Sequence, residues 1–294
     1  MSIRLAVVGH VEWVEFARVP KLPAPGEVVH ATETWREPGG GAAVAAVQLA
    51  RLGGSAELFT ALADDDGGRL ARARLEALGD DDLGHRAARE LGELGVRVET
   101  VWRPEPQRRA FVHVDAAGER TITVIGERMG PHGDDALPWD ELTEADAVYF
   151  TAGDVEAVRK SRAAKQLVAT TRALEALAPA GVELDVLVRS ARDPGERYES
   201  GELDPPPRFV AQTDGAAGGS LHAADGTEMR WVAAPLPGPP VNAYGAGDSF
   251  AAGLTYALGK GRSPDEAVEF GARCGAAVMT GRGPYESDLP ELVK

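Results

Sequence analysis

The sequence contains one cysteine, Cys274, among 294 residues. A single thiol forms neither an internal disulfide nor a multi-thiolate metal site, so the cysteine content fits a reduced cytoplasm. The six histidines are scattered without the spacing of zinc ligands. No apolar run approaches the roughly 20 residues that cross a bilayer. We therefore expect a soluble cytoplasmic protein without a structural zinc site.

Basic residues are also scarce, with 31 Lys and Arg against 46 Asp and Glu and a formal net charge of -15. No segment gathers Lys and Arg into a stripe, so nucleic acid is not expected as a partner. The Gly-Lys pair at 259–260 precedes a glycine instead of Ser or Thr, which argues against a P-loop. A nicotinamide-dependent dehydrogenase would need Gly-x-Gly-x-x-Gly directly after a strand, whereas residues 39–44 follow Arg36-Glu37-Pro38 and end in Val44, which argues against that class.

The apolar pattern predicts alternating strands and helices. Short apolar runs indicate buried strands at 3–8, 56–62, 147–151, 184–188 and 209–212. Helices are expected at 42–52, 155–177, 251–258 and after the capping sequence that begins at Ser263. Because strands and helices alternate, we predict an α/β fold with a mostly parallel central sheet.

Two further segments are typical of β-ribbons. Residues 11–36 mix Val, Phe and Trp with several prolines, which suits a bent ribbon better than a helix. Residues 109–115 and 120–125 flank a glycine-containing turn and predict a hairpin.

The sharpest chemical feature is the sequence Gly245-Ala246-Gly247-Asp248 at the start of a predicted helix. Small residues at a helix N-terminus expose backbone N–H groups to an anion, and the helix dipole favours negative charge. Phosphoryl transfer requires such donors together with a base that reaches the attacking hydroxyl. The tetrapeptide therefore favours phosphoryl transfer, although by itself it also fits a glycine-rich turn in which Asp248 only supports the helix start.

Two distant motifs resemble those of PfkB-type, ribokinase-like carbohydrate kinases. Residues 246–253, Ala-Gly-Asp-Ser-Phe-Ala-Ala-Gly, resemble the C-terminal signature, and residues 39–45, Gly-Gly-Gly-Ala-Ala-Val-Ala, resemble the N-terminal signature. The resemblance covers nearly the whole chain. It implies one three-layer α/β sandwich over residues 1–294, with lid strands inserted at about 11–38 and 99–125.

The resemblance also implies a role for each matched position. Asp248 would be the catalytic base, and the backbone of Gly245, Ala246 and Gly247 would form the anion hole. ATP and Mg²⁺ are the implied cofactors, and the implied cofactor-binding residues are Thr213, Gly215, Gly218, Asn242 and Ala276. The implied acceptor-binding residues are Glu12, Val14, Gly40, Gly41, Val44 and Asp248.

Several positions depart from the family pattern. Val14 stands where the family usually has an Asp that holds sugar hydroxyls, and Val44 stands where it has an Asn. Asn242 replaces an Asp, which puts monovalent-cation activation in doubt. An Asn-x-x-Glu motif that helps to organise Mg²⁺ has only a weak counterpart at 190–193.

These departures leave two functional hypotheses. The favoured one is an active kinase whose acceptor is a sugar, a sugar derivative or a nucleoside, with ribose itself disfavoured because a hydroxyl against an apolar wall stays unpaired. The alternative is a non-catalytic member of the same fold that binds a nucleotide or sugar. The resemblance also allows two copies to pair through their lid strands.

Overall fold

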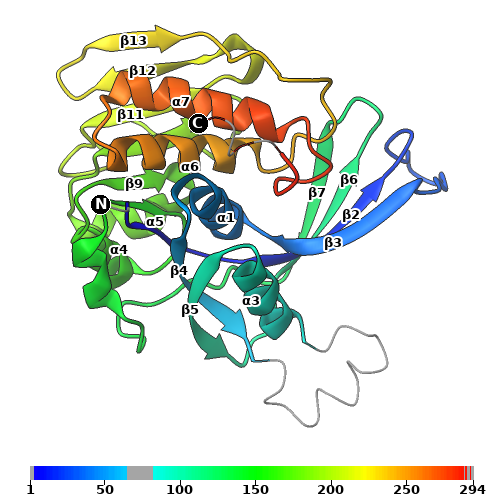
Figure 1. Ribbon diagram of the computed structural model, residues 1–294, viewed down its shortest axis with the longest axis horizontal. Coiled ribbons are helices and arrows are strands. Elements are labelled where there is room, and N and C mark those ends of the chain that lie inside the picture. Colours follow the sequence, from blue (N-terminus) through cyan, green and yellow to red (C-terminus); the bar gives the residue numbers. More distant parts are fainter. Residues whose placement is uncertain (1–2, 65–81, 288, 290–291, 293–294) are drawn as a thin grey trace.

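The computed structural model describes residues 3–64, 82–287, 289 and 292, and these residues form a helix-covered sheet with a smaller sheet beside it (Figure 1). The strand order in the central sheet is β13-β12-β11-β10-β9-β8-β1-β4-β5. Strands from β11 to β5 in this order are parallel, and β12 pairs antiparallel with both of its neighbours, β11 and β13. The strands are β1 Leu5–Val8, β4 Ala56–Ala63, β5 Val96–Arg103, β8 Ala147–Phe150, β9 Leu167–Thr170, β10 Val186–Ser190, β11 Phe209–Thr213, β12 Gly219–Ala223 and β13 Glu228–Trp231.

Helices cover both faces of the central sheet. The α-helices are α1 Gly41–Gly53, α3 Leu83–Glu93, α4 Val155–Ser161, α5 Leu174–Ala180, α6 Ala246–Gly259 and α7 Pro264–Val278. The short 3₁₀ helices are η1 Trp139–Glu144, η2 Thr171–Ala173 and η3 Gly215–Ala217. Leu5 and Val7 of β1 pack in one core with α1, α3, α6 and α7, whereas Ala6 and Val8 pack in a second core with η1, α4 and α5. The alternation of side chains along β1 therefore produces the expected three layers.

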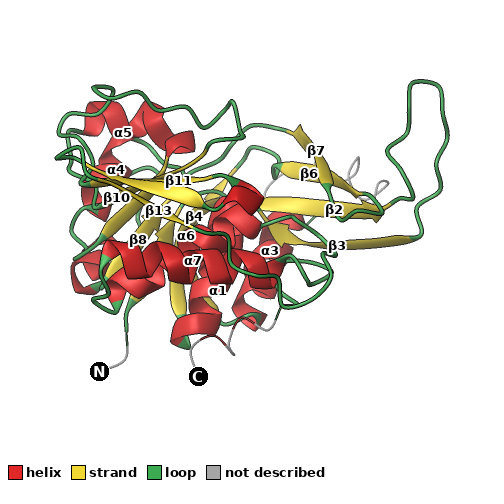
Figure 2. Ribbon diagram, turned by 90° about the horizontal axis from the view of Figure 1, so that it is seen from above, coloured by secondary structure: helices red, strands yellow, loops and turns green. Residues whose placement is uncertain are grey.

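The smaller sheet forms a lid that extends to one side of the helix-and-sheet body (Figure 2). Its strands, in the order β3-β2-β6-β7, are β3 Glu33–Gly39, β2 Glu12–Arg18, β6 Arg109–Val114 and β7 Arg120–Ile125. Strand β2 is parallel to β6, and the other pairs are antiparallel. The predicted ribbon and hairpin are thus parts of one sheet.

The position of β1 identifies the expected place for a ligand. Strand β1 lies between β8 and β4, and the chain builds the sheet outward in opposite directions from it. In open α/β sheets, ligands bind at the carboxyl ends of strands at such a switch point. The loops after β1 and β8 are therefore where a functional site is expected.

Two boundaries differ from the sequence predictions. The predicted helix at 155–177 is wrong in its middle, because Leu167–Thr170 form the buried strand β9 between β8 and β10. The lid segment predicted at about 99–125 begins too early, because residues 99–103 belong to β5, which pairs with β4 in the central sheet. The predicted capping box of α7, with Ser263 and Glu266, is confirmed.

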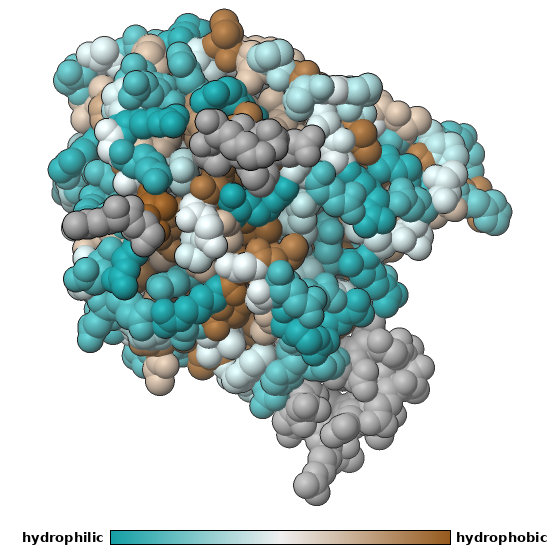
Figure 3. All heavy atoms as spheres, viewed as in Figure 1, coloured by the Kyte–Doolittle hydropathy of each residue, from teal (hydrophilic) through white to brown (hydrophobic). Residues whose placement is uncertain are grey.

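The surface is largely hydrophilic on the face drawn. Hydrophilic side chains cover most of the face drawn in Figure 3, and hydrophobic ones gather in small areas between them. Among the described residues, every helix is too short or too polar to span a bilayer.

On the lid, Ile122, Val124 and Ile125 of the edge strand β7 are exposed. Pairing of two copies through this edge stays a prediction.

Candidate active site

Asp248 lies in the first turn of α6, and the local sequence explains its position. Gly245 is the N-cap residue of this helix and has a φ of 78°, a left-handed conformation that favours glycine. A Cβ at Gly245 would lie 3.0 Å from Cβ of Pro284. No side chain caps the helix, and among the described residues the N–H groups of Gly247 and Asp248 have no backbone acceptor. The start of α6 therefore presents free donors beside a carboxylate.

The N-terminus of α1 faces the same carboxylate. Gly40, with a φ of 82°, is the N-cap residue of α1, and no side chain caps this helix either. A Cβ at Gly41 would lie 3.0 Å from Oδ1 of Asp248. Two uncapped helix N-termini thus converge on Asp248, and the structure brings the two glycine motifs together.

The environment of Asp248 shifts its acid–base behaviour. Burial raises the pKa of Asp248 to about 6, and the nearby Glu196 carboxylate also raises it. The guanidinium groups of Arg172 and Arg120 act in the opposite direction, and Glu12 has a further raising effect. A carboxyl with this pKa is ionised near neutral pH and is a stronger proton acceptor than an ordinary aspartate.

This pKa predicts a pH dependence of turnover. As the expected general base, Asp248 would accept a proton only as the carboxylate, so kcat/KM should be constant above about pH 6 and fall by about tenfold per pH unit below it. The measurement is kcat/KM with saturating nucleotide between about pH 4.5 and 8. A profile that stays flat down to about pH 5 would contradict this prediction.

Beside Gly40, four polar side chains form a connected chain. Nε of Arg108 donates to Oε1 of Glu12 at 2.7 Å, and Nε of Arg128 donates to Nδ1 of His10 at 3.1 Å. Nε2 of His10 lies 3.5 Å from Oε1 of Glu12. Burial lowers the pKa of His10 to about 4, so its ring is neutral, and Nε2 carries the proton that faces Glu12. Although burial opposes it, His10 and Arg108 lower the pKa of Glu12, which therefore stays ionised.

Val14 and Val44 lie in an apolar cluster under the lid. Both side chains are fully buried, together with Phe16, Val112 and Tyr244. The hydroxyl of Tyr244 accepts a hydrogen bond from the Gly40 N–H at 3.0 Å, which connects this cluster to the start of α1. Val14 and Val44, which the resemblance implies as acceptor-binding residues, are therefore enclosed in this cluster.

The predicted cofactor-binding residues lie on three separate elements. Thr213 ends β11, and Gly215 and Gly218 belong to the following loop, where Arg192 pairs with Asp214 at 2.8 Å. Asn242 precedes α6, and Ala276 is a buried residue of α7. Gly275, next to Ala276, packs against the first residue of α6, because a Cβ there would lie 3.0 Å from the carbonyl oxygen of Ala246.

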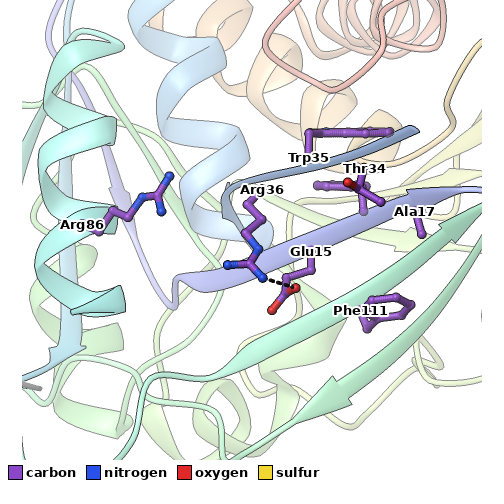
Figure 4. A pocket seen from close by; sticks show the side chains of 8 residues that line it. Glu15, Ala17, Thr34, Trp35, Arg36, Arg86 and Phe111 are labelled. Atoms are coloured by element: carbon purple, nitrogen blue, oxygen red, sulfur yellow. Dashed lines mark ion pairs between the residues drawn. The ribbon is translucent and has the colours of Figure 1, made fainter. Parts of the chain in front are cut away.

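A cavity of about 460 Å³ lies beside the lid strands β2 and β3 (Figure 4). Glu15 is one of the residues that line this cavity. It lies on the face of β2 opposite Glu12, because side chains alternate along a strand. Glu15 is paired with Arg36 at 3.1 Å, and the guanidinium of Arg86 lies 4.5 Å from the Trp13 ring centre. The charged groups of this cavity have partners within the protein, and the cavity is separate from the site around Asp248.

Comparison with known proteins identifies the family. Residues 2–79 and 203–292 match the pfkB family carbohydrate kinase model. An ATP-dependent ribose-1-phosphate kinase from Halopiger xanaduensis is 32% identical to this chain, over 99% of this chain and 97% of the relative. The chain belongs to the pfkB family. It is a carbohydrate kinase, as the two glycine motifs predicted.

Solved structures confirm the ribokinase-like fold of this pfkB kinase. The adenosine kinase of Sinorhizobium meliloti superposes with a TM-score of 0.72 at 19% identity, covering 97% of this chain and 96% of that chain. The ribokinase of Cryptococcus neoformans var. grubii in complex with ADP gives 0.68 at 20% identity, covering 99% and 98%. At these identities the similarity shows the fold alone.

The pfkB kinase also has site residues that the sequence patterns did not indicate. Glu196 accepts hydrogen bonds from the Ser190 N–H at 2.7 Å and from Nε of Arg172 at 2.9 Å. Arg172 also pairs with Asp193. The weak counterpart of the missing Mg²⁺ motif at 190–193 thus lies beside a second carboxylate, Glu196, whose charge acts on Asp248. Carboxylate oxygens suit a hard cation, so Asp193 and Glu196 fit Mg²⁺ by chemical type.

Thr151 is another residue that the motifs of the pfkB kinase did not indicate. It directly follows β8, and its buried Oγ1 has no hydrogen-bond partner among the described residues. A Cβ at Gly41 would lie 3.8 Å from Cγ2 of Thr151. A Cβ at Gly9 would overlap Oγ1 of Thr151, so the hydroxyl is directed at Gly9 and the methyl group faces Gly41. The only sequence feature that could have indicated Thr151 is its position as the polar last residue of the predicted strand 147–151.

Proposed function

We propose that this pfkB kinase transfers the γ-phosphoryl group of ATP to a hydroxyl of a sugar or sugar-like acceptor, with Asp248 as the general base. The observation that carries the proposal is the convergence of two uncapped helix N-termini on Asp248, with Gly41 against its Oδ1. The acceptor hydroxyl would occupy the space beside Gly41. The N–H groups at the start of α6 would face the transferring phosphoryl group.

Each part of the site has a task in this proposal. Asp248 takes the hydroxyl proton, and its raised pKa suits proton transfer near neutral pH. Arg172, which lies near both Asp248 and Glu196, contributes positive charge where phosphate charge develops. Asp193 and Glu196 would hold Mg²⁺, which neutralises the phosphate oxygens when bound.

The names of the relatives support an ATP-dependent sugar kinase. The Halopiger xanaduensis relative is named for ATP and ribose-1-phosphate, and it covers almost the whole chain. The Cryptococcus structure contains ADP in the same fold. These names support ATP as the phosphoryl donor and a small carbohydrate as the acceptor.

The test is transfer of labelled γ-phosphate from ATP to a panel of ribose, ribose 1-phosphate, ribose 5-phosphate, fructose and adenosine. We expect a labelled product with at least one acceptor in the wild type and almost none with Asp248→Asn. Nucleotide binding without transfer to any acceptor would instead support the alternative, a non-catalytic member of the fold.

The surroundings of Asn242 predict turnover without a monovalent cation. Its Nδ2 donates to the Arg282 carbonyl at 2.7 Å, and its Oδ1 accepts from the Tyr244 N–H at 2.9 Å. Both polar atoms of this buried side chain are satisfied, so the residues present do not fit a cation at this position. We expect the same kcat/KM in potassium and in tetramethylammonium buffers.

Asn242→Asp is the matched variant for this prediction. It would place a carboxylate oxygen against the Arg282 carbonyl, and an unsatisfied buried acceptor costs about 1 to 3 kcal/mol. Activity of the variant should be low in tetramethylammonium and increase as potassium is added. If the wild-type enzyme required potassium for turnover, the prediction that Asn242 makes a monovalent cation unnecessary would be wrong.

A further inference from the structure

The acceptor side of the site contains a guanidinium group for which the described chain supplies no carboxylate. Arg128 follows the lid strand β7, and it donates from Nε to His10 and from Nη1 to the Arg172 carbonyl, both at 3.1 Å. The carbonyl is neutral, and the buried ring of His10 is neutral as well. Among the described residues, Arg128 therefore has hydrogen bonds but no ion pair.

A second guanidinium group lies close by. Glu12 accepts the Nε proton of Arg108, which leaves the Nη groups of Arg108 for another acceptor. Burial and the nearby cations Arg108 and Arg172 all lower the pKa of Arg128, so its charge is disfavoured in the free protein. Arg108 and Arg128 with the single carboxylate of Glu12 give this end a local charge of about +1. This local excess of positive charge does not follow from the overall composition, because the chain has a net charge of -15.

An anionic ligand would remove this imbalance. Guanidinium groups match phosphate and carboxylate oxygens in a forked geometry. Two guanidinium groups that each retain free N–H donors suit a phosphate monoester better than a carboxylate, because the monoester offers three oxygens and up to two negative charges.

Gly40 and Gly41 lie between His10 and Asp248. A Cβ at Gly40 would lie 3.3 Å from Nε2 of His10, and a Cβ at Gly41 would lie 3.0 Å from Oδ1 of Asp248. The Cα atoms of these adjacent glycines are about 3.8 Å apart. A small ring that covers both glycines would therefore extend from Asp248 to His10, and a substituent on the ring would extend past His10 toward Arg128, which contacts its Nδ1.

Resting on the proposed function, we propose that Arg128 and Arg108 bind a phosphate monoester on the acceptor, so the substrate is a sugar phosphate whose free hydroxyl faces Asp248. The hydroxyl oxygen forms a bond to the γ-phosphorus, the bond from that phosphorus to the β–γ bridging oxygen breaks, and the hydroxyl proton passes to Asp248. The products are ADP and a sugar bisphosphate. The charged contact would replace hydroxyl contacts that the enclosed side chains of Val14 and Val44 do not supply.

The first experiment compares acceptors by the ratio of kcat/KM for ribose 1-phosphate to kcat/KM for ribose. We expect a ratio far above one in the wild type. Arg128→Gln should lower the ratio about tenfold to a hundredfold, because hydrogen bonds to charged groups contribute about 1.5 to 3 kcal/mol. The ratio for Arg128→Lys should lie between those of the wild type and Arg128→Gln, because lysine keeps the positive charge but loses the forked geometry of the guanidinium group. Arg230→Gln, an equal charge change at an exposed position of β13, is the control.

The second experiment measures binding and needs no turnover. Isothermal titration calorimetry with ribose 1-phosphate and with ribose 5-phosphate should show binding of at least one to the wild type. Arg128→Gln should weaken that binding by about tenfold or more, and Arg230→Gln should not. If catalysis fails with every acceptor, this measurement still decides whether the subsite exists.

Three results would overturn the inference. One is a wild type that binds neither sugar phosphate at millimolar concentration. Another is a wild type that uses ribose as efficiently as ribose 1-phosphate. The third is an equal loss with both acceptors in Arg128→Gln, which would place Arg128 on the transferring phosphoryl group instead of the acceptor.

Discussion

Asp248→Asn should lower kcat by about 10² to 10⁴-fold with every acceptor that the wild type phosphorylates. The amide keeps the shape of the side chain but cannot accept the hydroxyl proton, and removal of a general base typically has this effect. ADP binding, measured by calorimetry, should remain close to that of the wild type. A variant that turns over at the wild-type rate would exclude Asp248 as the base.

The same variant should also be more stable at neutral pH. Burial raises the folded-state pKa of Asp248 to about 6, above an ordinary aspartate value of about 3.9, so ionisation favours the unfolded state. Stability from the protonated group is present below about pH 4 and is lost as the pH rises through about 6. The gain in Tm from Asp248→Asn should therefore increase over this window. A Tm difference that is independent of pH would contradict the raised pKa.

Gly41→Val should lower kcat/KM by about 10²-fold. Its Cβ would lie 3.0 Å from Oδ1 of Asp248, and the added methyl groups would enter the space proposed for the acceptor hydroxyl. A misplacement of about 1 Å between reacting groups can cost this much. ADP binding should persist, because the change lies on the acceptor side.

Gly92→Val is the matched control for this prediction. Gly92 lies on α3, and a Cβ there would meet no atom within 4 Å. The same substitution at this exposed position should leave kcat/KM close to the wild-type value. If Gly41→Val were equally harmless, the acceptor would not lie beside Gly41.

The features predicted correctly from the sequence are those determined by neighbouring residues. The capping box at Ser263 and Glu266 depends on contacts within one helical turn, so its residues are sufficient to predict it. The glycines before Asp248 likewise determine the start of α6 through the backbone conformation of Gly245. Each of these two motifs depends only on residues that are close in sequence.

The features that were missed depend on distant partners. Strand β9 has only Leu167–Thr170 and is flanked by residues that favour helices, and its extended form comes from pairing with β8 and β10. Arg128 and Glu196 are single charged residues in loops, without a motif around them. Their importance follows from His10 and Arg172, to which only the folded chain brings them.

The buried cluster at Val14 has a consequence for how this enzyme could acquire a new substrate during evolution. Val14→Asp would restore the carboxylate of the family pattern, but the side chain is fully enclosed with Val44 and Tyr244. An unpaired charge in such a place costs several kcal/mol, a large share of the 5 to 15 kcal/mol that typically stabilise a domain. Reversion at this single position therefore passes through a poorly folded intermediate. Arg128 is a loop position outside this cluster and can change without repacking it, so it offers the more accessible route to a different acceptor.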